Sequence, residues 1–220
     1  IAAKQALIEF DIPGTIRVVG TPAEEKGGGK IILLDNGAFE TSDAVLLLHP
    51  TTGVSKIAGR CKSSHVIKAS YEGILSSAIS RPERGVNATE STVVAYQQLG
   101  SALRYLPNDV SIMPFITSHN VDDGLLPIVS EIEVFITAFE DASLSKAKEA
   151  VERVLLGAAD IVGTKIELKN EPGYLGRVVN ETIGTLLHNN MTYYGEPMQE
   201  GFIDDSGFED FEDDEIPDDD

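Results

Sequence analysis

A proline, two adjacent carboxylates and three glycines separate two apolar runs near the start of the chain. The first run, residues 15–19 (TIRVV), is rich in β-branched residues and predicts a buried strand. Pro22 ends its pairing, because proline has no N–H to donate. Glu24 and Glu25 follow, and then the glycines at 27–29. The sequence therefore predicts a loop with a carboxylate pair at the end of a strand.

The carboxylate pair allows two interpretations. Glu24 and Glu25 repel each other, and a bound cation or a shared proton would relieve that repulsion. One carboxylate would then bind a divalent metal while its neighbour handles a proton. In the alternative, the pair lies in a solvated acidic turn that Lys26 and Lys30 balance, a common arrangement. The pair alone favours the solvated turn.

A second apolar run ends at a histidine. Residues 30–36 predict a short helix that stops at Asn36-Gly37, and residues 44–48 (AVLLL) lead into His49. An uninterrupted apolar run is typical of a strand buried on both faces, and the strand–helix–strand order predicts an α/β unit with a parallel sheet. The carboxylate pair and His49 would then both lie at the carboxyl ends of strands, where such sheets place their sites.

From about residue 63 the pattern changes to alternating strands and amphipathic helices. Asn87-Ala88-Thr89-Glu90 resembles a capping box and opens a helix that runs towards Pro107. The predicted elements after residue 63 are strands at 65–71, 110–117, 128–139 and 164–169, and helices at 88–106 and 146–162. This β-α-β-β-α-β order is that of a ferredoxin-like module. A helix is also predicted near residues 178–187.

Charge and composition exclude some classes of partner. The chain has 220 residues and a net charge of −19, of which the eleven acids between Asp204 and Asp220 account for −11 and leave −8 elsewhere. An acidic surface repels phosphate backbones, so we expect no nucleic-acid partner. No apolar run reaches the roughly 18 residues of a transmembrane helix, so no membrane partner is expected. Cys61 is the only cysteine, which fits a reducing compartment and favours the cytoplasm.

The motif around the carboxylate pair resembles a known enzyme family. Residues 20–25 (GTPAEE), the glycine run and His49-Pro50 look like the zinc aminoacylase/carboxypeptidase family, in the amidohydrolase branch of aminobenzoyl-glutamate hydrolases and Xaa-Arg dipeptidases. The resemblance covers about residues 1–200 and is most specific over 14–50. It implies that Glu24 is the general base, that Glu25 and His49 bind zinc or another divalent metal, and that the substrate is an N-acyl amino acid, dipeptide or similar small amide.

The resemblance also implies a domain organisation. Residues 1–62 would be a partial catalytic α/β domain, residues 63–169 an inserted lid that also forms a homodimer, and residues 170–202 a return to the catalytic domain. Residues 203–220 are expected to form a disordered acidic tail; alternatively, a frameshift or splicing event replaced the last strand of the family there. The outer face of the first lid helix, with Tyr96 and Tyr105, is a candidate dimer contact. Because the chain begins with Ile1, it suggests a processed product or a fragment.

Several features of the family are missing from this chain. No histidine precedes Glu24, and none follows His188. Glu25 and His49 alone would hold zinc weakly, since catalytic sites commonly use three protein ligands. Ser77 stands where the lid histidine is expected, Gly124 where an asparagine is expected, and Thr137 where a carboxylate-binding arginine is expected. Each change removes a donor aimed at an oxyanion or carboxylate, and losing one such donor typically slows a reaction by about a hundred- to a thousandfold.

Three functions therefore remain open from the sequence. The chain is a metal-dependent amidohydrolase or dipeptidase seen as part of a longer protein, a catalytically inactive relative that forms a dimer and binds a small amide, or an unrelated acidic binding protein. His119, in a loop where the family has glycines, is a candidate replacement for the lid histidine. His65 is interpreted as a surface residue or one whose hydrogen bonds are satisfied, and His188 as a structural residue.

Overall fold

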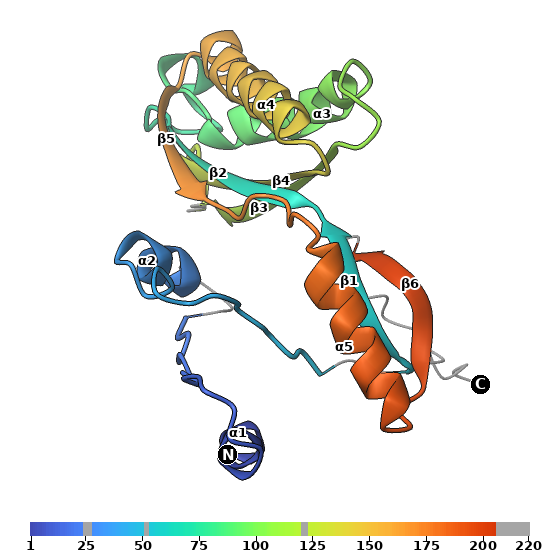
Figure 1. Ribbon diagram of the computed structural model, residues 1–220. Helices are drawn as coiled ribbons and strands as arrows, with labels where there is room; N and C mark the ends of the chain where they lie inside the picture. Colours follow the sequence, from blue (N-terminus) through green and yellow to red (C-terminus); the bar gives the residue numbers. More distant parts are fainter. Residues whose placement is uncertain (24–27, 51–52, 120–122, 206–220) are drawn as a thin grey trace, which may run out of the picture. The chain divides into compact units, whose positions relative to one another are not determined.

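The computed structural model describes residues 1–23, 28–50, 53–119 and 123–205 (Figure 1). The chain divides into two compact units, Ile1–Pro50 and Thr51–Asp220. Among the described residues, we find no helix with the length and apolar character needed to cross a bilayer.

The first unit contains two short helices and, in its described part, no strand. The helices are α1 (Ala2–Glu9) and α2 (Gly29–Asp35), and α2 lies where the sequence predicts a short helix. The strands predicted at 15–19 and 44–49 are wrong: both segments are unpaired. Arg17 instead donates to Ala38 O at 3.1 Å and to Thr41 Oγ1 at 2.7 Å, so the first segment is tied to the turns after α2.

The physical reason is that an extended run needs a neighbouring strand. β-propensity describes the fit to a half-buried pleated surface, and the backbone N–H and C=O groups require partners. Here the side chains of Val18, Leu47 and Leu48 are 92, 71 and 78 % exposed. The predicted parallel sheet of this unit is therefore not formed by the described residues of 1–50.

Parallel pairing occurs instead in the second unit. Strand β1 (Ser55–Cys61) pairs in parallel with β6 (Met198–Asp205), and α5 (Glu181–Tyr193) packs against both. Gly184 on α5 is buried, and any side chain at this position would collide with the ring of Phe202. The first three residues of the predicted acidic tail, 203–205, belong to strand β6. Residues 206–220 lie outside the described residues.

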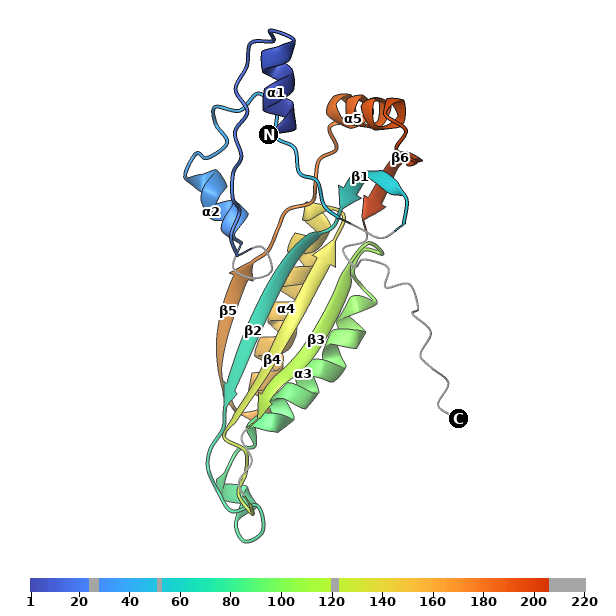
Figure 2. The same ribbon diagram turned by 90° about the horizontal axis from the view of Figure 1, so that it is seen from below.

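The larger part of the second unit is a four-stranded antiparallel sheet of order β3-β4-β2-β5. Its strands are β2 (Ser63–Glu72), β3 (Ser111–His119), β4 (Val129–Ala138) and β5 (Lys165–Pro172). Helices α3 (Ala88–Leu103) and α4 (Asp141–Val162) cover one face of this sheet, as Figure 2 shows, and a short 3₁₀ turn, η1 (Pro82–Arg84), precedes α3. The six elements follow in the order that the sequence predicts. We call residues 63–172 the four-stranded module.

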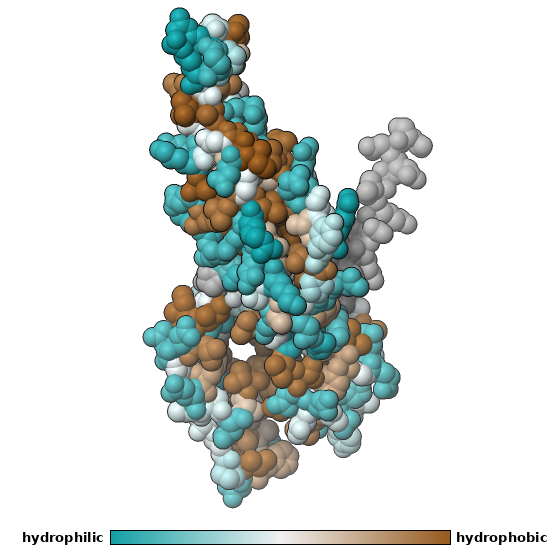
Figure 3. All heavy atoms as spheres, turned by 90° about the horizontal axis from the view of Figure 1, so that it is seen from above, coloured by the Kyte–Doolittle hydropathy of each residue, from teal (hydrophilic) through white to brown (hydrophobic). Residues whose placement is uncertain are grey.

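Alternation along the strands produces the core of this module. Every second residue of β2 and β4 is buried, which matches the period of two in a strand. The fully buried side chains include Ile67, Tyr71, Leu99, Ile132, Val134, Ile136, Val151 and Leu155. The Tyr71 hydroxyl donates to Leu155 O at 3.0 Å, and burial raises the pKa of Tyr71 above its ordinary value. Apolar and polar side chains are interspersed on the face drawn in Figure 3.

The predicted cap of the first module helix is present. Asn87 is the N-cap of α3, and its Oδ1 accepts from the Thr89 backbone N–H at 3.0 Å. Its Nδ2 donates to Glu90 Oε1 at 3.4 Å, so the N-terminal turn of α3 is closed by its own side chains.

Replacing this cap should destabilise the module measurably. We expect Asn87→Ala to lower the free energy of unfolding by about 1 kcal/mol, because the Thr89 N–H loses its acceptor. Urea unfolding measures the change, with Gln98→Ala on the exposed side of α3 as the control, expected within about 0.5 kcal/mol of the wild type. Equal stability of both variants would contradict the capping role.

Candidate functional site

His49 is the only predicted site residue that the structure describes. It is exposed, and its Nδ1 lies 2.9 Å from the Pro50 carbonyl oxygen. A carbonyl only accepts, so this contact requires a proton on Nδ1. Histidine ligands of metals commonly have this arrangement, in which a carbonyl fixes the tautomer. The chemistry of His49 therefore fits metal binding through Nε2.

The predicted convergence of the three site residues stays a prediction. Glu24 and Glu25 lie outside the described residues. Within the described part of the chain, no three His, Cys, Asp or Glu side chains gather in a way that would hold a metal ion. The described residues do not by themselves make a zinc site, since such a site needs about three protein ligands. A site that uses His49 requires ligands beyond them.

Two of the remaining histidines have packing environments that suit a structural role. His65 is buried, and its Nε2 lies 2.8 Å from Asn170 Oδ1, while Asn170 Nδ2 donates to Glu152 at 3.1 Å. His188 lies in α5, as the helical pattern predicts. His119 is the last residue of β3, and its proposed catalytic role stays a prediction.

At two positions where the family resemblance leads us to expect a catalytic donor, the local backbone explains why Ser77 and Gly124 are present. Ser77 Oγ accepts from the backbone N–H groups of Ile79 at 3.4 Å and Ser80 at 3.1 Å, so it closes a turn. Gly124 has φ +74°, a left-handed conformation that favours glycine. Both residues therefore serve the backbone of the loops that carry them.

The third expected donor position lies on the sheet. Thr137 is on β4, opposite Ser64 of β2 and Ser111 of β3. Its Oγ1 is buried and has no hydrogen-bond partner. A buried hydroxyl cannot bind a carboxylate at the surface, so this position does not replace the function of an arginine.

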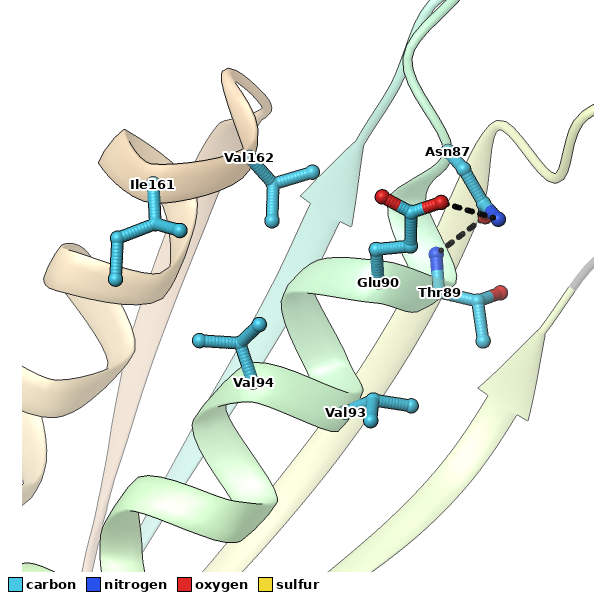
Figure 4. Close-up of a pocket in the computed structure, with 7 residues that line it drawn as sticks. All are labelled: Asn87, Thr89, Glu90, Val93, Val94, Ile161 and Val162. Atoms are coloured by element: carbon cyan, nitrogen blue, oxygen red, sulfur yellow. Dashed lines mark hydrogen bonds between the residues drawn. The ribbon is translucent and has the colours of Figure 1, made fainter. Parts of the chain in front are cut away.

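A pocket in the module lies between the N-terminus of α3 and the C-terminus of α4 (Figure 4). It has a volume of 450 Å³ and is lined by Asn87, Thr89, Glu90, Val93, Val94, Ile161 and Val162. Asn87 already binds Thr89 N and Glu90, whereas the buried Thr89 Oγ1 has no hydrogen-bond partner among the described residues. From the sequence, Asn87 is predicted only as a helix cap, and the valines form no pattern that marks a pocket.

A second, smaller pocket lies on the face of the sheet that α3 and α4 do not cover. It has a volume of 120 Å³ and includes Lys68, Glu131, Glu133, Glu167 and Lys169. Lys68 forms ion pairs with Glu171 at 2.9 Å and Glu133 at 3.0 Å, and hydrogen bonds from Lys68 to these two carboxylates raise its pKa. Lys169 also pairs with Glu167, at 3.3 Å, so Lys68, Glu133, Glu167 and Lys169 all form ion pairs within the sheet.

Comparisons with known proteins decide the family. The chain is 30 % identical to an Xaa-Arg dipeptidase of Mus musculus over 193 residues, which is 86 % of this chain and 44 % of the relative. The chain belongs to the amidohydrolase/dipeptidase family. It is 23 % identical to one of the p-aminobenzoyl-glutamate hydrolase subunits of Escherichia coli over 198 residues, 90 % of this chain and 41 % of that protein. The amidohydrolase-family chain thus spans less than half the length of these relatives. No family model matches it.

Solved structures support the fold of this amidohydrolase relative. A Staphylococcus aureus protein described as an aminohydrolase superposes with a TM-score of 0.70 at 19 % identity, over 93 % of this chain and 56 % of that one. A tripeptidase from the same species gives 0.58 at 15 % identity, over 72 % of this chain and 42 % of that one. The mixed α/β architecture, with a parallel and an antiparallel sheet, is shared with peptidases and aminohydrolases of this kind.

The buried hydroxyl of Thr137 makes a prediction about stability. Thr137→Val keeps the shape of the side chain and removes a buried unpaired oxygen, so we expect the free energy of unfolding to rise by about 0.5–1.5 kcal/mol. Ser130→Ala is the contrasting variant, because the Ser130 hydroxyl accepts from Thr92 Oγ1 at 2.7 Å. It should lower stability by about 1–3 kcal/mol. Urea unfolding compares them, and a loss of stability in Thr137→Val would contradict the assignment.

Proposed function

We propose that this chain is part of a hydrolase that cleaves an amide bond in a dipeptide, an N-acyl amino acid or a similar small amide. The observation that carries the proposal is its similarity, over most of its own length, to an Xaa-Arg dipeptidase and to part of a p-aminobenzoyl-glutamate hydrolase. The acidic composition and the absence of a predicted nucleic-acid surface are consistent with a small-molecule substrate.

Glu24, Glu25 and His49 are the residues we assign to the reaction. In this proposal Glu24 moves the proton, and Glu25 and His49 contribute two ligands to a zinc or other divalent ion. Such an ion would make a bound water acidic enough to attack near neutral pH. The carbonyl of Pro50 supports the role of His49, because histidine ligands of metals commonly donate their other ring N–H to a carbonyl. The other ligands would come from outside the described residues.

The metal content of the purified protein tests this proposal. We expect a longer form of the protein that includes the missing ligands to retain about two zinc ions per chain after dialysis and to cleave an N-acyl amino acid or dipeptide. Elemental analysis measures the zinc. His49→Ala should remove at least one ion, whereas His188→Ala, a control on α5, should leave the content unchanged. Equal zinc in the wild type and His49→Ala would contradict the assignment.

A second function is favoured by a specific observation. The residues at the expected donor positions serve other purposes: Ser77 closes a turn, Gly124 holds a left-handed backbone, and Thr137 has a buried hydroxyl. A catalytically inactive relative that binds a small amide would retain less than one tight zinc ion and cleave nothing.

We also propose that the four-stranded module is a ferredoxin-like lid through which two copies associate. The antiparallel strand order and the two helices on one face support the lid assignment. The candidate contact is the outer side of α3 and the edge strand β3 beside it. Exposed apolar groups there are Val93, Tyr96, Tyr105 and Ile116, with 43, 48, 88 and 45 % of their surface accessible.

A charge placed on this surface should separate the two copies. We expect Tyr96→Glu to weaken the dimer by about tenfold or more, because a carboxylate would be buried beside apolar groups without a partner. Sedimentation over a concentration series measures the association. Leu156→Glu on α4 is the matched control, since Leu156 is exposed to a similar degree (45 %). A dimer that survives in Tyr96→Glu, or a wild-type monomer, would contradict the proposal.

A further inference from the structure

The pocket between the ends of α3 and α4 combines apolar side chains with one carboxylate. Its apolar groups come from both helices, and they are Val93 and Val94 on α3 and Ile161 and Val162 on α4. Figure 4 shows Val94 and Val162 on the facing sides of the two helices, with the Glu90 carboxylate beside them. The volume of 450 Å³ is within the range of pockets that bind small molecules. The lining therefore suits a small ligand with an apolar chain and one polar end.

Part of the apolar lining is left in contact with water. Ile161 is 72 % exposed and Val93 is 43 % exposed, whereas Val151 and Leu155, earlier on α4, are fully buried in the core of the module. Removing apolar surface from water is favourable. A hydrocarbon chain that lies in the pocket would therefore gain from covering surface that the core of the module does not use.

The free hydrogen-bonding capacity of Glu90 indicates which polar end fits. Glu90 is exposed, and its Oε1 accepts from Asn87 Nδ2 at a long 3.4 Å. Within the part of the chain that the structure describes, no lysine or arginine forms an ion pair with Glu90. A carboxylate accepts hydrogen bonds and donates none, and its strongest partners are positively charged donors. The complementary ligand group is therefore a cation with N–H donors.

The end of α4 favours the same charge. The C-terminus of a helix carries partial negative charge, and its last carbonyl groups have no partner within the helix. The last turn of α4 contains no basic side chain, and Ile161 and Val162 of that turn line the pocket. The opposite partial charge, at the N-terminus of α3, is met by the protein itself, because Asn87 Oδ1 accepts from the Thr89 N–H. The pocket therefore favours a cation over an anion.

We propose that this pocket binds a small aliphatic amine in its ammonium form. The alkyl chain lies against Val94, Ile161 and Val162, and the ammonium group pairs with Glu90 next to the end of α4. The net charge of −19 favours the same class of ligand, because an acidic protein attracts cations and repels anions. The site uses none of the residues assigned to amide hydrolysis, and it does not rest on that activity.

A titration of the ¹⁵N-labelled full chain with hexylammonium chloride tests the site. We expect the amide signals of Val94, Val162 and Gly163 to shift to saturation. The affinity should rise along the series from methylammonium to hexylammonium, by up to about fourfold for each methylene that is buried. Hexanoate, with a similar chain and the opposite charge, should leave these signals in place. Unmoved signals with hexylammonium, equal shifts with hexanoate, or an affinity independent of chain length would overturn the proposal.

A matched pair of variants tests the role of the carboxylate. Glu90→Gln removes the charge and keeps an oxygen that can accept from Asn87, so the cap of α3 is preserved. We expect it to weaken hexylammonium binding by about three- to tenfold. Glu149→Gln removes an exposed carboxylate elsewhere on α4 and should leave the affinity unchanged. Wild-type affinity in Glu90→Gln would overturn the assignment. Equal weakening in both variants would also overturn it, because the net charge would then explain the binding.

Discussion

The pairing of β2 with a strand on each side is the interaction on which the described structure depends. Its ten residues pair with β4 on one side, and eight of them also pair with β5 on the other. The alternation along β2 sends His65, Ile67, Ala69 and Tyr71 to the face covered by α3 and α4. Because side chains alternate with a period of two, a shift by one residue would expose this whole set. The strand therefore fixes the register of the module and the position of both helices.

Periodicity predicted this module because its elements bury one face each. The spacing of apolar residues alone predicts the helix that Asn87 caps, and it also predicts the strands before and after this helix. The same method failed for residues 15–19 and 44–49, whose composition is that of strands but which have no partner in the described part of their unit. It also missed β1 and β6, because Lys56 and Arg60 in one, and Glu200 and Asp204 in the other, interrupt the apolar pattern. Each of these two strands forms only by pairing with the other, and the paired residues are about 140 positions apart in the sequence.

In the candidate site, too, some features follow from neighbouring residues in the chain, and others depend on residues that are distant in the sequence. The contact of His49 Nδ1 is made with the next residue in the chain, Pro50, and suits a ligand. Whether His49 meets Glu24 and Glu25 depends on the path of residues that the structure does not describe. At Ser77 and Gly124, by contrast, the local backbone explains the residue, and no substrate contact is required. The family relationship therefore supports a hydrolase more firmly than the described side chains support turnover.

The most direct test of the central claim is the ¹⁵N spectrum of the imidazole rings during a zinc titration. His65, His119 and His188 serve as internal references in the same spectrum. If Glu25 and His49 share a metal, the Nε2 signal of His49 shifts on adding zinc, its Nδ1 stays protonated, and Glu25→Gln weakens the effect. A His49 signal that does not respond to zinc, or that responds equally in Glu25→Gln, would contradict the account.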